Sequence, residues 1–291
     1  MTPYLIGIIC GVLAMLGWGI GEATAKLAVA KTSEFVSYFW VEVIVASVFV
    51  LVGIARGAHL LLIGPYVLAF ALVIAGTYTL AYIFSYRAYR VGKLAIVSPI
   101  LCSYGMLSSL LAALFLHQQV TPLQLIAISL IIGATIALSL DIPALRQGDL
   151  KMTHGVKEAL IAFVFFGVNS VFLDYISERA DIHLLNMLIS LLSLMLVAAY
   201  LLVRNVSVRL TKVDRTGKLY LLATGILTLG ANYFFIYGYS VGDSIVIAPL
   251  GAASGTVTAL ISLIFFREKL TKLQLLAVAI SLVGIVLLSL G

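Results

Sequence analysis

Three ionisable side chains lie within apolar stretches of the chain, where burying each of them is costly. Glu22 and Lys26 stand one helical turn apart in the first apolar segment, and Glu42 lies inside the second. An ionisable group inside a bilayer must be paired or hydrated, so it is a candidate for function. Counted along two helices of opposite direction, the carboxyl groups of Glu22 and Glu42 fall at similar depth. We therefore expect the three residues to form one cluster.

This cluster has two interpretations. In the first, Glu22 and Lys26 form an i, i+4 ion pair, Glu42 joins them, and the three charges neutralise one another. In the second, two carboxylates compete for one ammonium, and the surplus carboxylate binds a proton or a cationic substrate. The residues alone leave both interpretations open.

Aromatic and small polar side chains supply further candidates for binding an organic solute. Tyr78 and Tyr82 share one helical face in the third apolar segment, where their rings can stack against an organic ring or cation. Helix packing and interhelical hydrogen bonds are the alternative roles for the small polar residues and for the asparagines. The candidate substrate-binding residues are Trp18, Glu22, Tyr78, Tyr82, Ser103, Asn169, Asn232, Tyr233, Tyr237 and Ser254.

Residues typical of catalysis or metal binding are scattered. The four histidines lie at segment ends without HxxxH or HExxH spacing, and no phosphate-binding GxxxxGK[ST] run occurs. We therefore expect no enzyme activity, no cofactor and no metal site. A membrane-embedded enzyme and a channel are remote alternatives.

Long apolar helices must position all these residues. The chain of 291 residues is 63% hydrophobic and 10% charged, which is typical of an integral membrane protein. A bilayer-spanning helix needs about 20 apolar residues. Polar and Gly/Pro-rich breaks predict ten such helices, over 4–29, 35–55, 66–90, 94–116, 122–140, 155–178, 184–203, 217–239, 244–266 and 272–290.

The chain contains an internal repeat. At one constant offset Gly17 aligns with Gly167 and Pro99 with Pro249, and the Thr121–Leu125 motif aligns with 271–275. Each half holds five predicted helices, an odd number, so the halves cross the membrane in opposite senses. The expected fold is an all-α membrane protein, with two inverted five-helix repeats around a central cavity. The repeats span 1–140 and 155–291, and a polar linker spans 141–154.

The charges in the first half are not repeated in the second. The positions equivalent to Glu22, Lys26 and Glu42 hold Phe172, Ile176 and Leu192. The duplicated scaffold does not itself require the charges, which favours a functional role for them.

Lysine and arginine predict the orientation. Of the 18 such residues, nearly all lie at the odd-numbered connections, and the exceptions are Arg56 and Arg179. The positive-inside rule places those connections in the cytoplasm and both termini outside. The formal net charge of +6 is therefore explained by topology, and we expect no nucleic-acid partner.

Several motifs resemble one family. The GWG run at 17–19 followed by Lys26, the helix starts at Pro99 and Pro249, and the run from Arg267 to Thr271 are similar to the EamA-type domain of the drug/metabolite transporter superfamily. The resemblance covers both halves. It implies a carrier for small organic solutes, with a cavity lined by the first, third, fourth, sixth, eighth and ninth helices.

The expected function is secondary active transport in the cell membrane. Small metabolites or drugs, either amino-acid-like or aromatic and amphipathic, would move outward by alternating access, with protons as a candidate coupling ion. A uniporter or solute exchanger is the nearest alternative.

Overall fold

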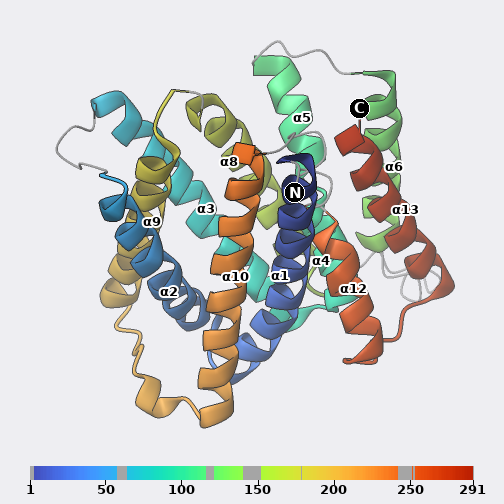
Figure 1. The fold of residues 1–291 in the computed structure, drawn as a ribbon. Coiled ribbons are helices and arrows are strands. Elements are labelled where there is room, and N and C mark those ends of the chain that lie inside the picture. Colours follow the sequence, from blue (N-terminus) through green and yellow to red (C-terminus); the bar gives the residue numbers. More distant parts are fainter. Residues whose placement is uncertain are drawn as a thin grey trace.

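A computed structural model describes residues 3–57, 64–115, 121–139, 152–177, 179–241, 251 and 253–290, and its regular elements within these ranges are helices (Figure 1). The predicted all-helical class is confirmed. The predicted linker at 141–154 lies almost entirely outside the described residues.

The described residues of the first half form six helices. They are α1 (Pro3–Lys31), α2 (Glu34–Ala55), α3 (Pro65–Val91), α4 (Leu94–Cys102), α5 (Tyr104–Phe115) and α6 (Pro122–Ser139). The second half forms α8 (Val156–Ser177), α9 (Ile182–Val203), the 3-10 turn η2 (Leu210–Lys212), α10 (Arg215–Val241), α12 (Ser254–Ile264) and α13 (Lys272–Leu290). Most boundaries lie within three residues of those predicted. The predicted ninth helix is described only in part, because residues 244–250 and 252 lie outside the described ranges.

The predicted helix over 94–116 is wrong in one respect, since it is broken into α4 and α5. Pro99 lacks an N–H and so removes one backbone hydrogen bond to the turn before it, but α4 continues through it to Cys102. The chain then turns at Ser103, whose hydroxyl donates to the carbonyl oxygen of Ile100 at 2.6 Å. The next helix starts directly afterwards, at Tyr104.

The repeated Thr-x-x-Gln motif caps two helices. The backbone N–H of Thr121 donates to Gln124 Oε1 at 2.9 Å, and the N–H of Gln124 donates to Thr121 Oγ1 at 3.2 Å. Thr271 and Gln274 make the same two bonds, at 3.1 and 3.2 Å, before α13. Both pairs are capping boxes, which satisfy the free N–H groups at a helix start. This part of the repeat therefore serves helix formation.

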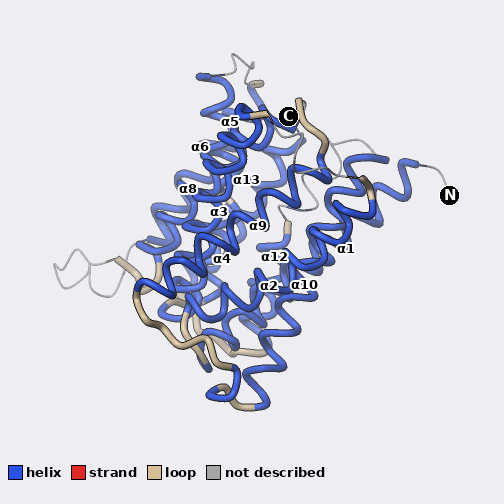
Figure 2. The backbone as a smooth tube through the Cα atoms, turned by 90° about the vertical axis from the view of Figure 1, so that its left-hand side faces the viewer, coloured by secondary structure: helices blue, strands red, loops and turns tan. Residues whose placement is uncertain are grey.

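Helices of the two halves pack against one another. Helix α1 lies along α10, α3 along α8, α2 along α9 and α6 along α13. Glycine allows the closest approach, because a Cβ on Gly17 would lie 2.9 Å from the Cβ of Ala231. Helix α1 begins and α13 ends at the same end of the bundle (Figure 1). Described loops gather at the opposite end, as the side view in Figure 2 shows.

The helices suit a bilayer. Among the described residues, five helices are long and apolar enough to cross a membrane. On α1 the exposed large side chains form a single apolar stripe, namely Leu5, Ile9, Leu13, Leu16 and Ile20. Such a stripe, on a helix whose other faces are packed, is the surface that faces lipid.

Candidate functional site

Glu22 points into the bundle. At 100° per residue it lies about 200° around α1 from Ile20, which is opposite the lipid-facing stripe. Its carboxylate accepts a short hydrogen bond from the hydroxyl of Ser98 on α4. Tyr89 of α3 and Thr258 of α12 lie beside the same carboxylate. Glu22 nevertheless remains half-buried although it faces the interior.

A short polar path joins the two halves next to Glu22. The Sγ of Cys102 lies 4.0 Å from Ser98 Oγ and 3.6 Å from Ser254 Oγ at the start of α12. The hydroxyl of Thr258, one turn along α12, donates to the carbonyl oxygen of Gly19 on α1 at 3.1 Å. Ser254 thus lies at the interior contact of α4 and α12. Ser103 is buried and serves the turn between α4 and α5.

Glu42 occupies a separate, sealed position. Its side chain is 2% exposed, and its Oε1 has no hydrogen-bond partner among the described residues. Tyr38 on α2 and the stripe Tyr78, Tyr82 and Tyr86 on α3 lie near enough to interact electrostatically with its carboxyl group. The ring of Tyr82 lies 4.6 Å from that of Tyr78 and 5.7 Å from that of Tyr38, measured between centroids. Tyr78, Tyr82 and Tyr86 therefore lie on the side of α3 near Glu42.

The expected cluster of Glu22, Lys26 and Glu42 does not form. The Nζ of Lys26 lies 2.6 Å from Oε1 of Glu268, in the connection between α12 and α13, and donates to the carbonyl oxygen of Gly92 at 3.0 Å. The ammonium group of Lys26 therefore binds Glu268 and the carbonyl oxygen of Gly92 instead of Glu22. The i, i+4 ion pair is thus replaced by a pair between the two halves.

Glu268 joins the two halves of the chain through several hydrogen bonds. Besides Lys26, its carboxylate accepts hydrogen bonds from the N–H groups of Leu94 and Ala95, each at 3.0 Å, and from the hydroxyl of Ser262. Leu94 and Ala95 begin α4, so the carboxylate also meets the positive end of a helix dipole. Burial alone would raise the pKa of Glu268, but the hydrogen bonds from Lys26, Ser262 and the two N–H groups outweigh it and lower that pKa.

Sequence reasoning did not select Glu268, because the run Arg267-Glu268-Lys269 is typical of a solvated connection. One signal was present: the repeat-equivalent position holds Gln118, so this carboxylate, like Glu22 and Glu42, belongs to one half only.

Three further candidates make interhelical hydrogen bonds. The indole Nε1 of Trp18 donates to Oδ1 of Asn232 at 3.0 Å, which joins α1 to α10. The side-chain amide of Asn169 donates to the carbonyl oxygen of Ile74 at 2.8 Å and to Thr77 Oγ1 at 2.9 Å, which joins α8 to α3. These bonds match the packing alternative, and Trp18 also contacts Phe235 edge to face at 4.8 Å.

Tyr233 and Tyr237 do not join the interior group. They are 47% and 43% exposed, and they continue the outward apolar face of α10 that includes Leu222 and Ile226. Their rings stack on each other at 6.2 Å. The structure therefore contradicts the expectation that they line the interior.

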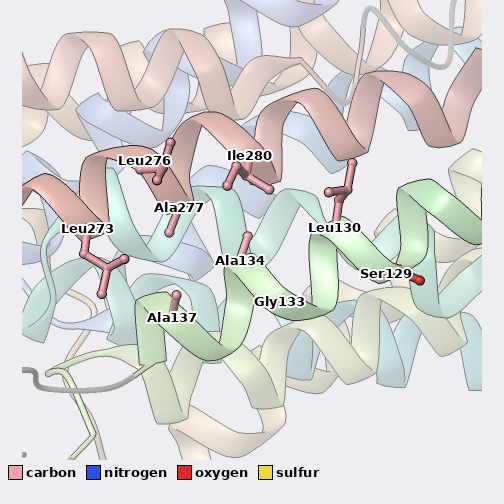
Figure 3. Close-up of a pocket in the computed structure, with 9 residues that line it drawn as sticks. All are labelled: Ser129, Leu130, Gly133, Ala134, Ala137, Leu273, Leu276, Ala277 and Ile280. Atoms are coloured by element: carbon pink, nitrogen blue, oxygen red, sulfur yellow. The ribbon is translucent and has the colours of Figure 1, made fainter.

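An apolar groove of about 210 Å³ lies elsewhere, between α6 and α13 (Figure 3). Its lining is apolar apart from Ser129, and it includes Leu130, Ala134, Leu273 and Ile280. None of the candidate residues lies in it. Within the described residues there is also no group of three side chains able to hold a metal ion.

Together the apolar helices and the polar interior define a multi-pass helical membrane protein. The EamA-like transporter family model matches residues 5–140 and again residues 154–290. The chain therefore belongs to the EamA-like transporter family.

The chain is also similar to a curated protein in sequence and to a solved structure in fold. An uncharacterized protein of Methanocaldococcus jannaschii, MJ1333.1, is 23% identical over 135 residues, which cover 45% of this chain and 93% of that protein. A solved structure described only as the crystal structure of a protein has a TM-score of 0.66 at 18% identity, over 97% of this chain and 96% of its own. The second likeness concerns the fold alone.

Proposed function

We propose that the protein is a secondary transporter of small organic solutes, working by alternating access around Glu22. The observation that carries this proposal is a half-buried carboxylate on the inward face of α1, bounded by helices from both halves of the chain. Family membership supports transport of small solutes. Glu22, Tyr78, Tyr82 and Ser254 are the proposed substrate contacts, with Trp18 and Asn232 at the edge of the site.

The proposal includes two inverted five-helix repeats. The family model matches each half separately, and the relative from Methanocaldococcus jannaschii matches 135 residues, about the length of one half. The packing of the helices also supports two repeats. When the halves are swapped, the packed pair α1 and α10 corresponds to the packed pair α8 and α3. A pseudo-symmetric site between such repeats can open to either side of the membrane in turn. The cell membrane, with both termini outside, and outward transport complete the proposal.

Energy would come from an ion gradient. The sequence contains no GxxxxGK[ST] segment for a nucleotide, whereas two carboxyl groups lie in the interior of the bundle. Proton exchange through Glu22 or Glu42 is the version that the site supports best.

The test is solute flux in proteoliposomes. Purified protein is first screened with metabolites by thermal shift, with amino-acid-like and aromatic amphipathic solutes first. Any stabilising solute is then tested for saturable counterflow and for uptake driven by a pH gradient. We expect counterflow, and we expect Glu22→Gln or Glu42→Gln to remove the response to the gradient. Equal gradient dependence in the wild type and in both variants would exclude proton coupling through these groups.

The same assay separates the alternatives. A uniporter or exchanger shows counterflow without a gradient response, and a channel shows no saturation. Conversion of the solute into another compound would indicate an enzyme.

A further inference from the structure

We propose that the two interior carboxyl groups have different ligands: Glu42 is the proton-binding site and is protonated in this conformation, whereas Glu22 stays ionised and meets the cargo. This inference rests on the proposed transport function. It assigns the coupling ion to one residue, and it predicts a cargo that carries an ammonium group.

The side chain of Glu42 is isolated from solvent inside the bundle. Its side chain is 2% exposed on the packed face of α2, together with Tyr38, Val45 and Phe49. Its Oε1 is buried without a hydrogen-bond donor among the described residues. An ionised carboxylate left unpaired in an apolar interior costs far more free energy than the neutral acid. Protonation is the way in which such a group avoids that cost.

No ion pair between described residues supplies a cation to Glu42. The ion pairs formed by described residues are Lys26–Glu268, Lys31–Asp214, Arg87–Glu158 and Arg90–Glu34, and none includes Glu42. Lys26, the ammonium that the sequence suggested as its partner, is held 2.6 Å from Glu268.

The groups that face Glu42 do not supply a charge either. From α2 and α3 the titratable neighbours are Tyr38, Tyr78, Tyr82 and Tyr86. From α9 and α10, which also pack against α2, the described buried polar residues are hydroxyl groups only: Ser190, Ser193, Thr224 and Thr228. On α1, Glu22 lies beyond Tyr82 and would add negative charge.

The tyrosine rings near Glu42 leave no room between them for an organic cation. The ring centroids of Tyr38 and Tyr86 lie 6.2 Å apart, and those of Tyr82 and Tyr86 lie 6.1 Å apart, so these rings contact one another. Tyr38 and Tyr86 are almost completely buried. An organic ammonium ion cannot enter between rings in contact, but a proton needs no cavity. The hydroxyl of Tyr86 is also buried without a hydrogen-bond partner among the described residues, so this region holds two buried polar groups that no described residue satisfies.

Glu22 differs from Glu42 in burial and in hydrogen bonding, although it too belongs to none of the ion pairs between described residues. The residue is half-buried on the inward face of α1, and the hydroxyl of Ser98 donates to its carboxylate. A donated hydrogen bond favours the ionised form of a carboxylate. An accessible carboxylate beside tyrosine rings suits an ammonium group of the cargo.

The proposed exchange is a simple proton transfer. When the bundle opens and the half-buried rings of Tyr78 and Tyr82 part, water reaches Glu42. The carboxyl O–H bond breaks, the proton passes to water, and both electrons of the bond remain on the carboxylate. When the bundle closes, the carboxylate takes a proton back before burial.

Infrared difference spectroscopy tests the protonation state without transport. Wild-type protein at pH 7 should show the carbonyl stretching band of a neutral carboxylic acid, shifted in heavy water. Glu42→Gln should lose this band, whereas the matched control Glu22→Gln should keep it. Glu42→Asp should keep an acid band at a shifted frequency, which guards against a folding defect in the glutamine variant. A wild-type spectrum that keeps the band after Glu42→Gln, or that has no band, overturns the assignment.

Transport gives the second readout. Glu42→Gln should lose the response to a pH gradient, and Glu22→Gln should lose binding of amine-bearing solutes relative to their neutral isosteres. Intact counterflow without the infrared band refutes the proton site alone. An infrared band with no counterflow in the wild type refutes the transport function instead. Equal binding of amines and neutral isosteres refutes the role of Glu22.

Discussion

Replacing Glu268 by glutamine should loosen the contact between the two halves. The carboxylate accepts from Lys26, from two N–H groups of α4 and from Ser262. Glutamine keeps one acceptor oxygen and brings an NH₂ group that faces donors. Hydrogen bonds to a charged group contribute about 1.5–3 kcal/mol each. The side chain of Lys26 is 23% exposed and can regain water, so part of the loss is recovered. We expect a net loss of about 2–4 kcal/mol.

Thermal unfolding in detergent, followed by intrinsic tryptophan fluorescence, measures this loss. At roughly 2 °C per kcal/mol for a chain of this size, Tm should fall by about 4–8 °C. Glu158→Gln is the matched control, because Glu158 lies 3.7 Å from a half-exposed Arg87 and its pair should contribute less than about 1 kcal/mol. An unchanged Tm in Glu268→Gln, or an equal fall in the control, would refute the reasoning.

Two further measurements separate the ion pair from the helix cap. Combining Lys26→Glu with Glu268→Lys restores opposite charges but puts a cation at the start of α4, so the double variant should stay destabilised. The pKa of Glu268 is lowered on folding, so its contribution is complete above the unfolded value of about 4.3 and is lost as the pH falls through the folded pKa. Glu268→Gln should therefore lack this acid-dependent part of the unfolding curve. Full recovery of Tm in the double variant would mean that Glu268 stabilises the fold only through its ion pair with Lys26.

Two other changes should follow from packing and hydrogen bonding. Asn169→Ala removes two bonds to acceptors on α3 and should cost about 1–2 kcal/mol, measured by thermal unfolding; no loss would mean that water replaces the amide. Gly92→Ala should destabilise by about 1–3 kcal/mol, because its Cβ would lie 2.7 Å from Val97 and 2.8 Å from the carbonyl oxygen of His154. Gly133→Ala on α6, where a Cβ meets nothing within 4 Å, should be neutral or stabilising, and a similar loss in both would contradict the steric explanation.

The helical spans and the inward position of Glu22 and Glu42 were predictable from sequence. Long apolar runs bounded by polar residues leave little choice of element, and a carboxylate is expelled from the lipid-facing side by its own desolvation cost. The break that follows Pro99 was harder to place, because proline is tolerated in membrane helices when a neighbour satisfies the freed backbone.

The long-range partner of Lys26 and the rotation of α10 about its own axis were not predictable from the sequence. Lys26 and Glu268 are 242 residues apart, and no local pattern indicates that α1 and the α12–α13 connection meet. Tyr233 and Tyr237 were misplaced for a related reason. In a membrane helix both the packed and the lipid-facing sides are apolar, so periodicity does not identify the inward side.

The pairing of α1 with α10 has a consequence for how the protein is made. Gly17 and Thr24 lie against Ala231 and Thr224, and the two threonine hydroxyls that meet are separated by 200 residues of chain. During synthesis α1 enters the membrane long before its neighbour exists, so its small-residue surface must be covered by lipid or by an insertion factor. Only when the second half emerges from the ribosome does the first half gain its native neighbours.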